Sequence, residues 1–77
     1  MEYDVHIDRP WPGTISDDTQ LEIHIAVEST DGVTFVVTSS RKDEISATVL
    51  VRADSFDEAC TLATDSFDAA IAVALTM

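Results

Sequence analysis

Apolar and polar residues alternate over four separate stretches of the chain, and this two-residue period is typical of half-buried β-strands. The stretches cover residues 3–8, 20–28, 33–38 and 45–52. Odd-numbered positions carry most of the apolar side chains in each stretch, so these positions are expected to face the core. The sequence therefore predicts an antiparallel sheet of about four strands.

A short loop between the second and third stretches predicts a hairpin. Residues 30–32 supply three loop residues, and Gly32 stands where such a loop needs a left-handed backbone. An odd loop length keeps odd-numbered residues on the same face, which sets Val27 opposite Phe35. On the opposite face this register predicts a small apolar island of Ala26, Val36 and Leu50.

The period changes after Asp54, where an amphipathic helix is predicted. Ser55 and Glu58 form the pattern of a capping box, and no glycine or proline interrupts residues 55–77. Apolar residues recur at helical spacing along one stripe: Phe56, Ala59, Cys60, Ala63, Phe67, Ala70, Ile71 and Ala74. The predicted fold class is α+β, a β-β-β-β-α chain of one domain over residues 1–77, with its C-terminal helix packed on one sheet face.

The junction between the last strand and the helix resembles that of small antitoxins of the HicB kind. The resemblance rests on the passage Val-Arg-Ala-Asp-Ser-Phe-Asp-Glu-Ala at residues 51–59. The predicted hairpins upstream differ from that family, so the resemblance transfers no function to this chain.

The net charge of the protein limits the classes of partner that it is expected to bind. The chain has 15 acidic residues against 4 basic ones, a formal net charge of −11. Phosphate backbones and anionic membranes should be repelled, whereas basic proteins should be attracted. Solubility, a high-salt cytoplasm and imitation of a nucleic acid each account for this acidity. No signal peptide or membrane-spanning run is evident in the sequence, so a cytoplasmic protein is expected.

Little in the sequence points to catalysis or to a cofactor. His6 and His24 are the only histidines, and with nearby carboxylates they could hold a divalent metal if their strands were paired. Cys60 falls on the apolar helix stripe and is expected to be a buried thiol. Gly-rich phosphate loops, serine triads and zinc-binding helix motifs are missing. We therefore expect a protein that is not an enzyme and that needs no cofactor or metal.

The helix offers more apolar surface than one sheet face requires. Leu62, Ser66, Ala69 and Val73 form a second seam at helical spacing. In a monomer with a single helix much of this seam would be exposed, which predicts a helix–helix dimer. The alternative is that the edge strand or the loop around Trp11 covers the seam.

Two further features are candidate contacts for a partner. Asp57, Asp65 and Asp68 give the outer helix face a row of carboxylates. Trp11, held between two prolines, either fills an open end of the core or anchors a partner.

The predicted function is a small acidic interaction module. It is expected to self-associate through its helix and to bind a basic or apolar patch on another protein, and its sharpest form is a phage-type inhibitor that imitates a nucleic acid. Two alternatives remain: a metal protein or enzyme that uses His6 and His24, and a structural assembly subunit.

Overall fold

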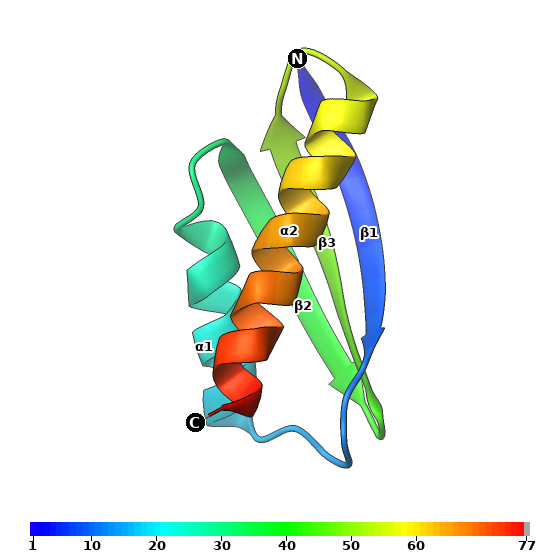
Figure 1. The fold of residues 1–77 in the computed structure, drawn as a ribbon, viewed down its shortest axis with the longest axis vertical. Helices are drawn as coiled ribbons and strands as arrows, with labels where there is room; N and C mark the ends of the chain where they lie inside the picture. Colours follow the sequence, from blue (N-terminus) through cyan, green and yellow to red (C-terminus); the bar gives the residue numbers. More distant parts are fainter. Residues whose placement is uncertain (77) are drawn as a thin grey trace.

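Three strands form one antiparallel sheet, and two helices cover one of its faces (Figure 1). The computed structural model describes residues 1–76. The elements in chain order are β1 (Glu2–Pro10), α1 (Asp17–Glu28), β2 (Val33–Arg41), β3 (Glu44–Arg52) and α2 (Phe56–Leu75). The predicted α+β class is confirmed, but three strands and two helices replace the expected four strands and one helix.

The last strand of the chain lies in the middle of the sheet. The order is β1-β3-β2, with both outer strands antiparallel to β3. Among residues 1–76, β2 and β3 are the one pair of strands that forms a hairpin, and Asp43 in its turn has a φ of +65°. Strand β1 therefore lies at one edge of the sheet, and the two strands beside β3 are not joined to each other in the sheet.

Both β1 and β3 turn the predicted residues toward the helices. Val5 and Ile7 on β1 are buried, as are all four odd-numbered residues from Ile45 to Val51 on β3. They form one core with residues from the other elements: Ile15, Ile23, Val27, Val36, Ala59, Ala63, Phe67, Ala70 and Ile71. The alternation predicted these two inner faces correctly because both strands keep a regular pleat.

The inner face of β2 differs from the prediction. The register shifts between Val33 and Phe35, so that Val33 pairs with Val51 and Phe35 pairs with Leu50. This bulge moves the following residues to the other face. Val36 is buried, whereas Phe35 is 60% exposed on the outer face. The expected apolar island is therefore wrong, because Val36 lies under the helices.

Residues 20–28 form most of helix α1 and are not a strand. Ser16 caps the helix, accepting a hydrogen bond from the backbone N–H of Thr19. Apolar side chains two residues apart lie on different sides of a helix, and those four apart share a side. Ile23 and Val27 consequently enter the core, while Leu21 and Ile25 are exposed. The predicted hairpin at residues 30–32 is wrong, because this loop joins a helix to a strand.

Helix α2 agrees with its predicted start and buried face. Ser55 is the N-cap and accepts a hydrogen bond from the backbone N–H of Glu58 at 3.2 Å. Most of the predicted stripe is buried or partly buried against the sheet, although Phe56 is 53% exposed and its ring lies in a T-shaped arrangement with that of Tyr3.

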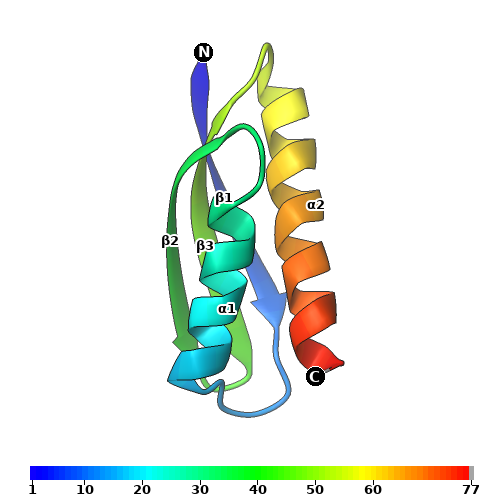
Figure 2. The same ribbon diagram turned by 90° about the vertical axis from the view of Figure 1, so that its left-hand side faces the viewer.

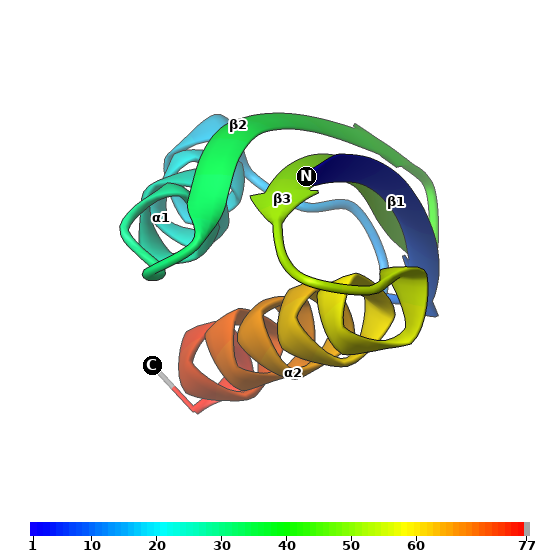
Figure 3. The same ribbon diagram turned by 90° about the horizontal axis from the view of Figure 1, so that it is seen from above.

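The two helices lie side by side on the same side of the curved sheet (Figures 2 and 3). Helix α1 packs along β2, and α2 packs across β1 and β3. Helix α1, which was not predicted from the sequence, therefore lies directly beside α2.

Candidate interaction groove and polar sheet face

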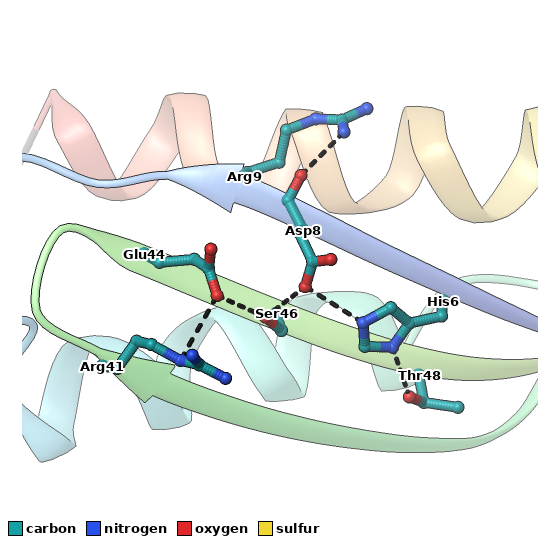
Figure 4. Close-up of polar contacts among 7 residues, drawn as sticks. All are labelled: His6, Asp8, Arg9, Arg41, Glu44, Ser46 and Thr48. Carbon is teal, nitrogen blue, oxygen red and sulfur yellow. Dashed lines mark hydrogen bonds and ion pairs between the residues drawn. The ribbon is translucent and has the colours of Figure 1, made fainter.

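The outer face of the sheet carries a connected row of polar side chains (Figure 4). His6 on β1 lies opposite Thr48 on β3, and its ring contacts the Thr48 hydroxyl at 2.9 Å through Nδ1 and Asp8 at 3.0 Å through Nε2. The Asp8 carboxylate only accepts, so Nε2 of His6 carries the proton of the hydrogen bond between them. The next residue along the row, Ser46, donates to the same oxygen of Asp8 at 2.5 Å.

This network changes the acidity of one carboxyl group. The hydrogen bond from Ser46 is the main cause that lowers the pKa of Asp8 below its ordinary value. Desolvation is the next largest effect and opposes it, while the charge and hydrogen bond of His6 and the charge of Arg41 lower the pKa further. The three groups stand in the order Thr48 hydroxyl, His6 imidazole and Asp8 carboxylate, an order that can activate a nucleophile in an enzyme. In this protein, however, His6 and Asp8 are both more than half exposed, and they lie on the sheet face away from the helices.

The two histidines do not meet. Thr38, which contacts His24 at 3.4 Å, pairs with the buried Ala47 and therefore points to the helix side of the sheet. His6 points to the other side with Thr48. Within residues 1–76 no group of three potential metal ligands comes together. The geometry gives no support to a metal site shared by His6 and His24.

A groove with an apolar floor runs between the two helices. Its deeper part is a hollow of about 350 Å³, lined by Glu22, Ile23, Ala26, Thr30, Ser66, Ala69, Ala70, Val73 and Ala74. Toward the start of α2 the groove continues into a shallower part, lined by Thr30, Asp57, Glu58, Thr61, Leu62, Asp65 and Ser66. We call the two parts together the helix groove.

The predicted second seam of α2 forms one wall of the helix groove. The N-terminal half of the seam has contacts within the chain: Leu62 packs over Gly32, and Ser66 shares a hydrogen bond of 2.7 Å with Thr30. The C-terminal half of the seam stays open, since Ala69 is exposed and Val73 is 61% exposed. The α1 helix and its following loop cover part of the seam, whereas the alternative predicted from the sequence was an edge strand or the Trp11 loop.

Carboxylates border the helix groove, and no lysine or arginine is among the described residues that line it. Glu22 contributes from α1, while Asp57 and Asp65 contribute from α2. The third member of the predicted carboxylate row, Asp68, turns toward β1 and forms an ion pair with Arg9 at 2.7 Å. This hydrogen-bonded pair also raises the pKa of Arg9. The row is thus shorter than predicted.

Trp11 is partly buried and packs against the core. Its backbone N–H donates to the carbonyl of Asp43, and Gly13 is bound to the same residue through two further hydrogen bonds. The hairpin turn therefore holds this loop in place. These contacts favour the core-filling role of Trp11 over the anchoring one.

Cys60 is a free thiol that is partly buried and packed against the core, close to the buried position expected for it. By contrast, the residues that α1 contributes to the groove, Glu22, Ile23 and Ala26, were missed as site residues. The sequence feature that indicates the helix carrying them is the cap Ser16 followed by two acidic residues, a typical helix start.

Comparison with known proteins finds no match: no family model, no curated protein and no solved structure aligns significantly with this chain. Within the described residues, neither helix combines the length and the apolar character needed to cross a bilayer.

Proposed function

We propose that this protein is a non-enzymatic interaction module that binds a basic surface of another protein. The observation that carries the proposal is where the few positive charges lie. Arg9 and Arg41 are engaged with Asp68 and Glu44, and neither Lys42 nor Arg52 lies on a helix. The helical side of the molecule therefore presents acidic groups among which Arg9 is the one arginine paired with a helix residue, and this excess of negative charge attracts and steers a basic partner.

The most specific version of this proposal is that the protein imitates a nucleic acid. An inhibitor of this kind would occupy the basic groove in which a nucleic-acid-binding protein holds phosphates. Asp57 and Asp65 support it, because both are exposed on α2 and make no ion pair within residues 1–76. Asp68 gives it less support, because Arg9 neutralises that position.

Self-association is a second proposal, and it rests on Ala69 and Val73 alone. These two residues keep the open half of the seam apolar. Two copies would each bring a formal net charge of −11 to the contact, which opposes association at low salt. If self-association were the whole function, the protein would be an assembly subunit.

Affinity capture at two salt concentrations tests the binding of a basic partner. Immobilised protein is exposed to an extract of the source cell at about 50 mM and about 500 mM KCl, a range over which the Debye length falls several-fold. The expected bound proteins carry basic clusters, are released at high salt and bind less to a variant with Asp57→Asn and Asp65→Asn. Capture that is insensitive to both salt and the substitutions would contradict the proposal.

A further inference from the structure

We infer that the helix groove binds one amphipathic basic helix of a partner protein, with the apolar face of that helix on the groove floor. The inference rests on the proposed function and deepens it, since it names the site and the kind of segment that enters it. Its basis is the combination of an apolar floor, acidic borders and walls that are helical apart from the loop residue Thr30.

The floor suits side chains of moderate size. Small residues, among them Ala26, Ala69 and Ala70, leave the hollow of about 350 Å³ between the helices. Val73 stands at its side with 61% of its surface exposed. A leucine or isoleucine from a partner would bury this surface together with its own, and removing apolar area from water favours binding.

The borders select the charge of the occupant. Glu22 on α1 and Asp65 on α2 line opposite walls, and Asp57 and Glu58 line the shallower end. A helix with lysine or arginine on both sides of its apolar stripe can place a cation near each border. An acidic or neutral helix of the same shape gains nothing from these charges, so the borders supply specificity and a faster encounter.

The walls select the backbone of the occupant. Apart from the loop residue Thr30, the walls are helical, and backbone groups inside α1 and α2 are already hydrogen-bonded within their helices. An extended peptide would find no sheet edge there, and its own N–H and C=O groups would lose water without replacement. A helix satisfies its own backbone and lays residues at i, i+3, i+4 and i+7 along a groove.

A second copy of this chain is a poorer occupant. The exposed apolar residues of α1, Leu21 and Ile25, share their helix with Asp18, Glu22 and Glu28, so that α1 of a neighbour would bring like charges to the acidic borders. Like charges across an interface cost stability and slow association. The acidic borders of the groove are better matched by a partner that brings positive charges.

Two synthetic peptides of 18 residues test the inference by isothermal titration calorimetry in about 50 mM KCl. The first is a lysine-leucine-alanine helix with one apolar stripe, about 27 Å long. The second has the same composition in scrambled order, so that its charge is equal and its stripe is lost. We expect the amphipathic peptide to bind at least about tenfold more tightly, a difference that charge alone does not produce.

Two matched variants locate the contact. Val73→Asp places a charge on the open wall of the groove, and Val37→Asp places it on the outer sheet face, at a valine that is 51% exposed. We expect Val73→Asp to lower the affinity for the amphipathic peptide at least about tenfold and Val37→Asp to leave it within about twofold. Circular dichroism confirms that both variants are folded.

The outcomes separate the inference from the proposed function. Equal binding of both peptides, or equal effects of both variants, would overturn the groove site and leave an acidic surface of general affinity for basic proteins. No binding of either peptide, together with salt-insensitive capture, would overturn both. A wild-type dimer in sedimentation equilibrium that Val73→Asp dissociates would show that a second copy fills the groove, and would also overturn the inference.

Discussion

At the scale of single residues, Gly32 shows how closely the loop after α1 approaches α2. Its φ is +95°, and a Cβ built there would lie 3.3 Å from Cδ1 of Leu62 and 3.6 Å from the carbonyl oxygen of Arg52. Its own carbonyl accepts a hydrogen bond from the backbone N–H of Arg52. This one position therefore joins the α1 loop, the end of β3 and the wall of the groove.

Gly32→Ala should destabilise the protein more than Gly13→Ala. Both glycines have positive φ, so either alanine carries a backbone cost of about 1 kcal/mol or more. Only Gly32 has neighbours within 4 Å of an added Cβ, so its variant must also displace Leu62. Urea unfolding of the two variants gives both losses, and equal losses would contradict the proposed packing of Leu62 over Gly32.

Ser46→Ala should raise the pKa of Asp8 toward its ordinary value, because Ser46 supplies the main hydrogen bond that lowers it. A carboxyl group with a depressed folded pKa stabilises the fold above its unfolded pKa of about 3.9, and this stabilisation is lost as pH falls through the folded pKa. The variant should therefore lose less stability than the wild type between pH 7 and strong acid.

Carbon-13 titration of the Asp8 carboxyl, with urea unfolding at neutral and acid pH, measures both effects. Ser39→Ala is the matched control, since Ser39 pairs with Ser46 across the sheet and its side chain makes no hydrogen bond within residues 1–76. An unchanged Asp8 pKa in Ser46→Ala would disprove the role given to that hydroxyl.

At the scale of elements, α1 depends on its surroundings more than α2 does. Its apolar residues are largely β-branched, which lowers helix propensity, and its twelve residues are near the lower limit for an isolated helix. Its Ser16 cap, its two core residues and the contacts of Gln20 with Thr38 and Ser40 hold it on β2.

A synthetic peptide of residues 14–30 should therefore have little helix by circular dichroism, whereas the same segment is helical in the folded protein. Within the protein, Ser16→Ala should cost about 1 kcal/mol of unfolding free energy, because it removes an N-cap. Ser29→Ala, at the other end of the same helix, should cost much less. A strongly helical peptide would contradict this dependence on tertiary contacts.

The same dependence explains which elements the sequence could predict. The buried faces of β1, β3 and α2 follow from patterns with one interpretation, and the cap at Ser55 marks the start of α2. Residues 21–27 fit two periods at once, because apolar residues at every second position also include pairs four apart. Only packing on β2 decides between these interpretations. The groove could not be predicted for this reason, although the α2 side of it was.

At the scale of the whole molecule, charge should limit stability. Fifteen acidic residues against four basic ones leave a net charge of −11, and the excess carboxylates repel one another across a domain whose longest extent is 36 Å. The Debye length exceeds most of these separations at 10 mM salt and falls to a few Å near 1 M. Added salt should therefore stabilise the fold.

Raising KCl from about 10 mM to about 500 mM should increase Tm by several degrees, with roughly 4–8 °C corresponding to about 1 kcal/mol in a domain of this size. A variant with Asp31→Asn and Asp65→Asn should have a higher Tm at low salt and a smaller response. Thermal unfolding followed by circular dichroism gives both values. A Tm that does not change with KCl would show that the repulsion is already relieved.

The central position of β3 also sets the order in which the chain can fold. Both partners of β3 precede it in the sequence, and the contact between His6 and Thr48 joins residues 42 positions apart. During synthesis, β1 and α1 leave the ribosome with no sheet to join, and they stay uncovered until residue 52 has emerged. Assembly must then wait for α2 to close the core, so the strands of the nascent chain stay without this covering helix until residue 75 has emerged.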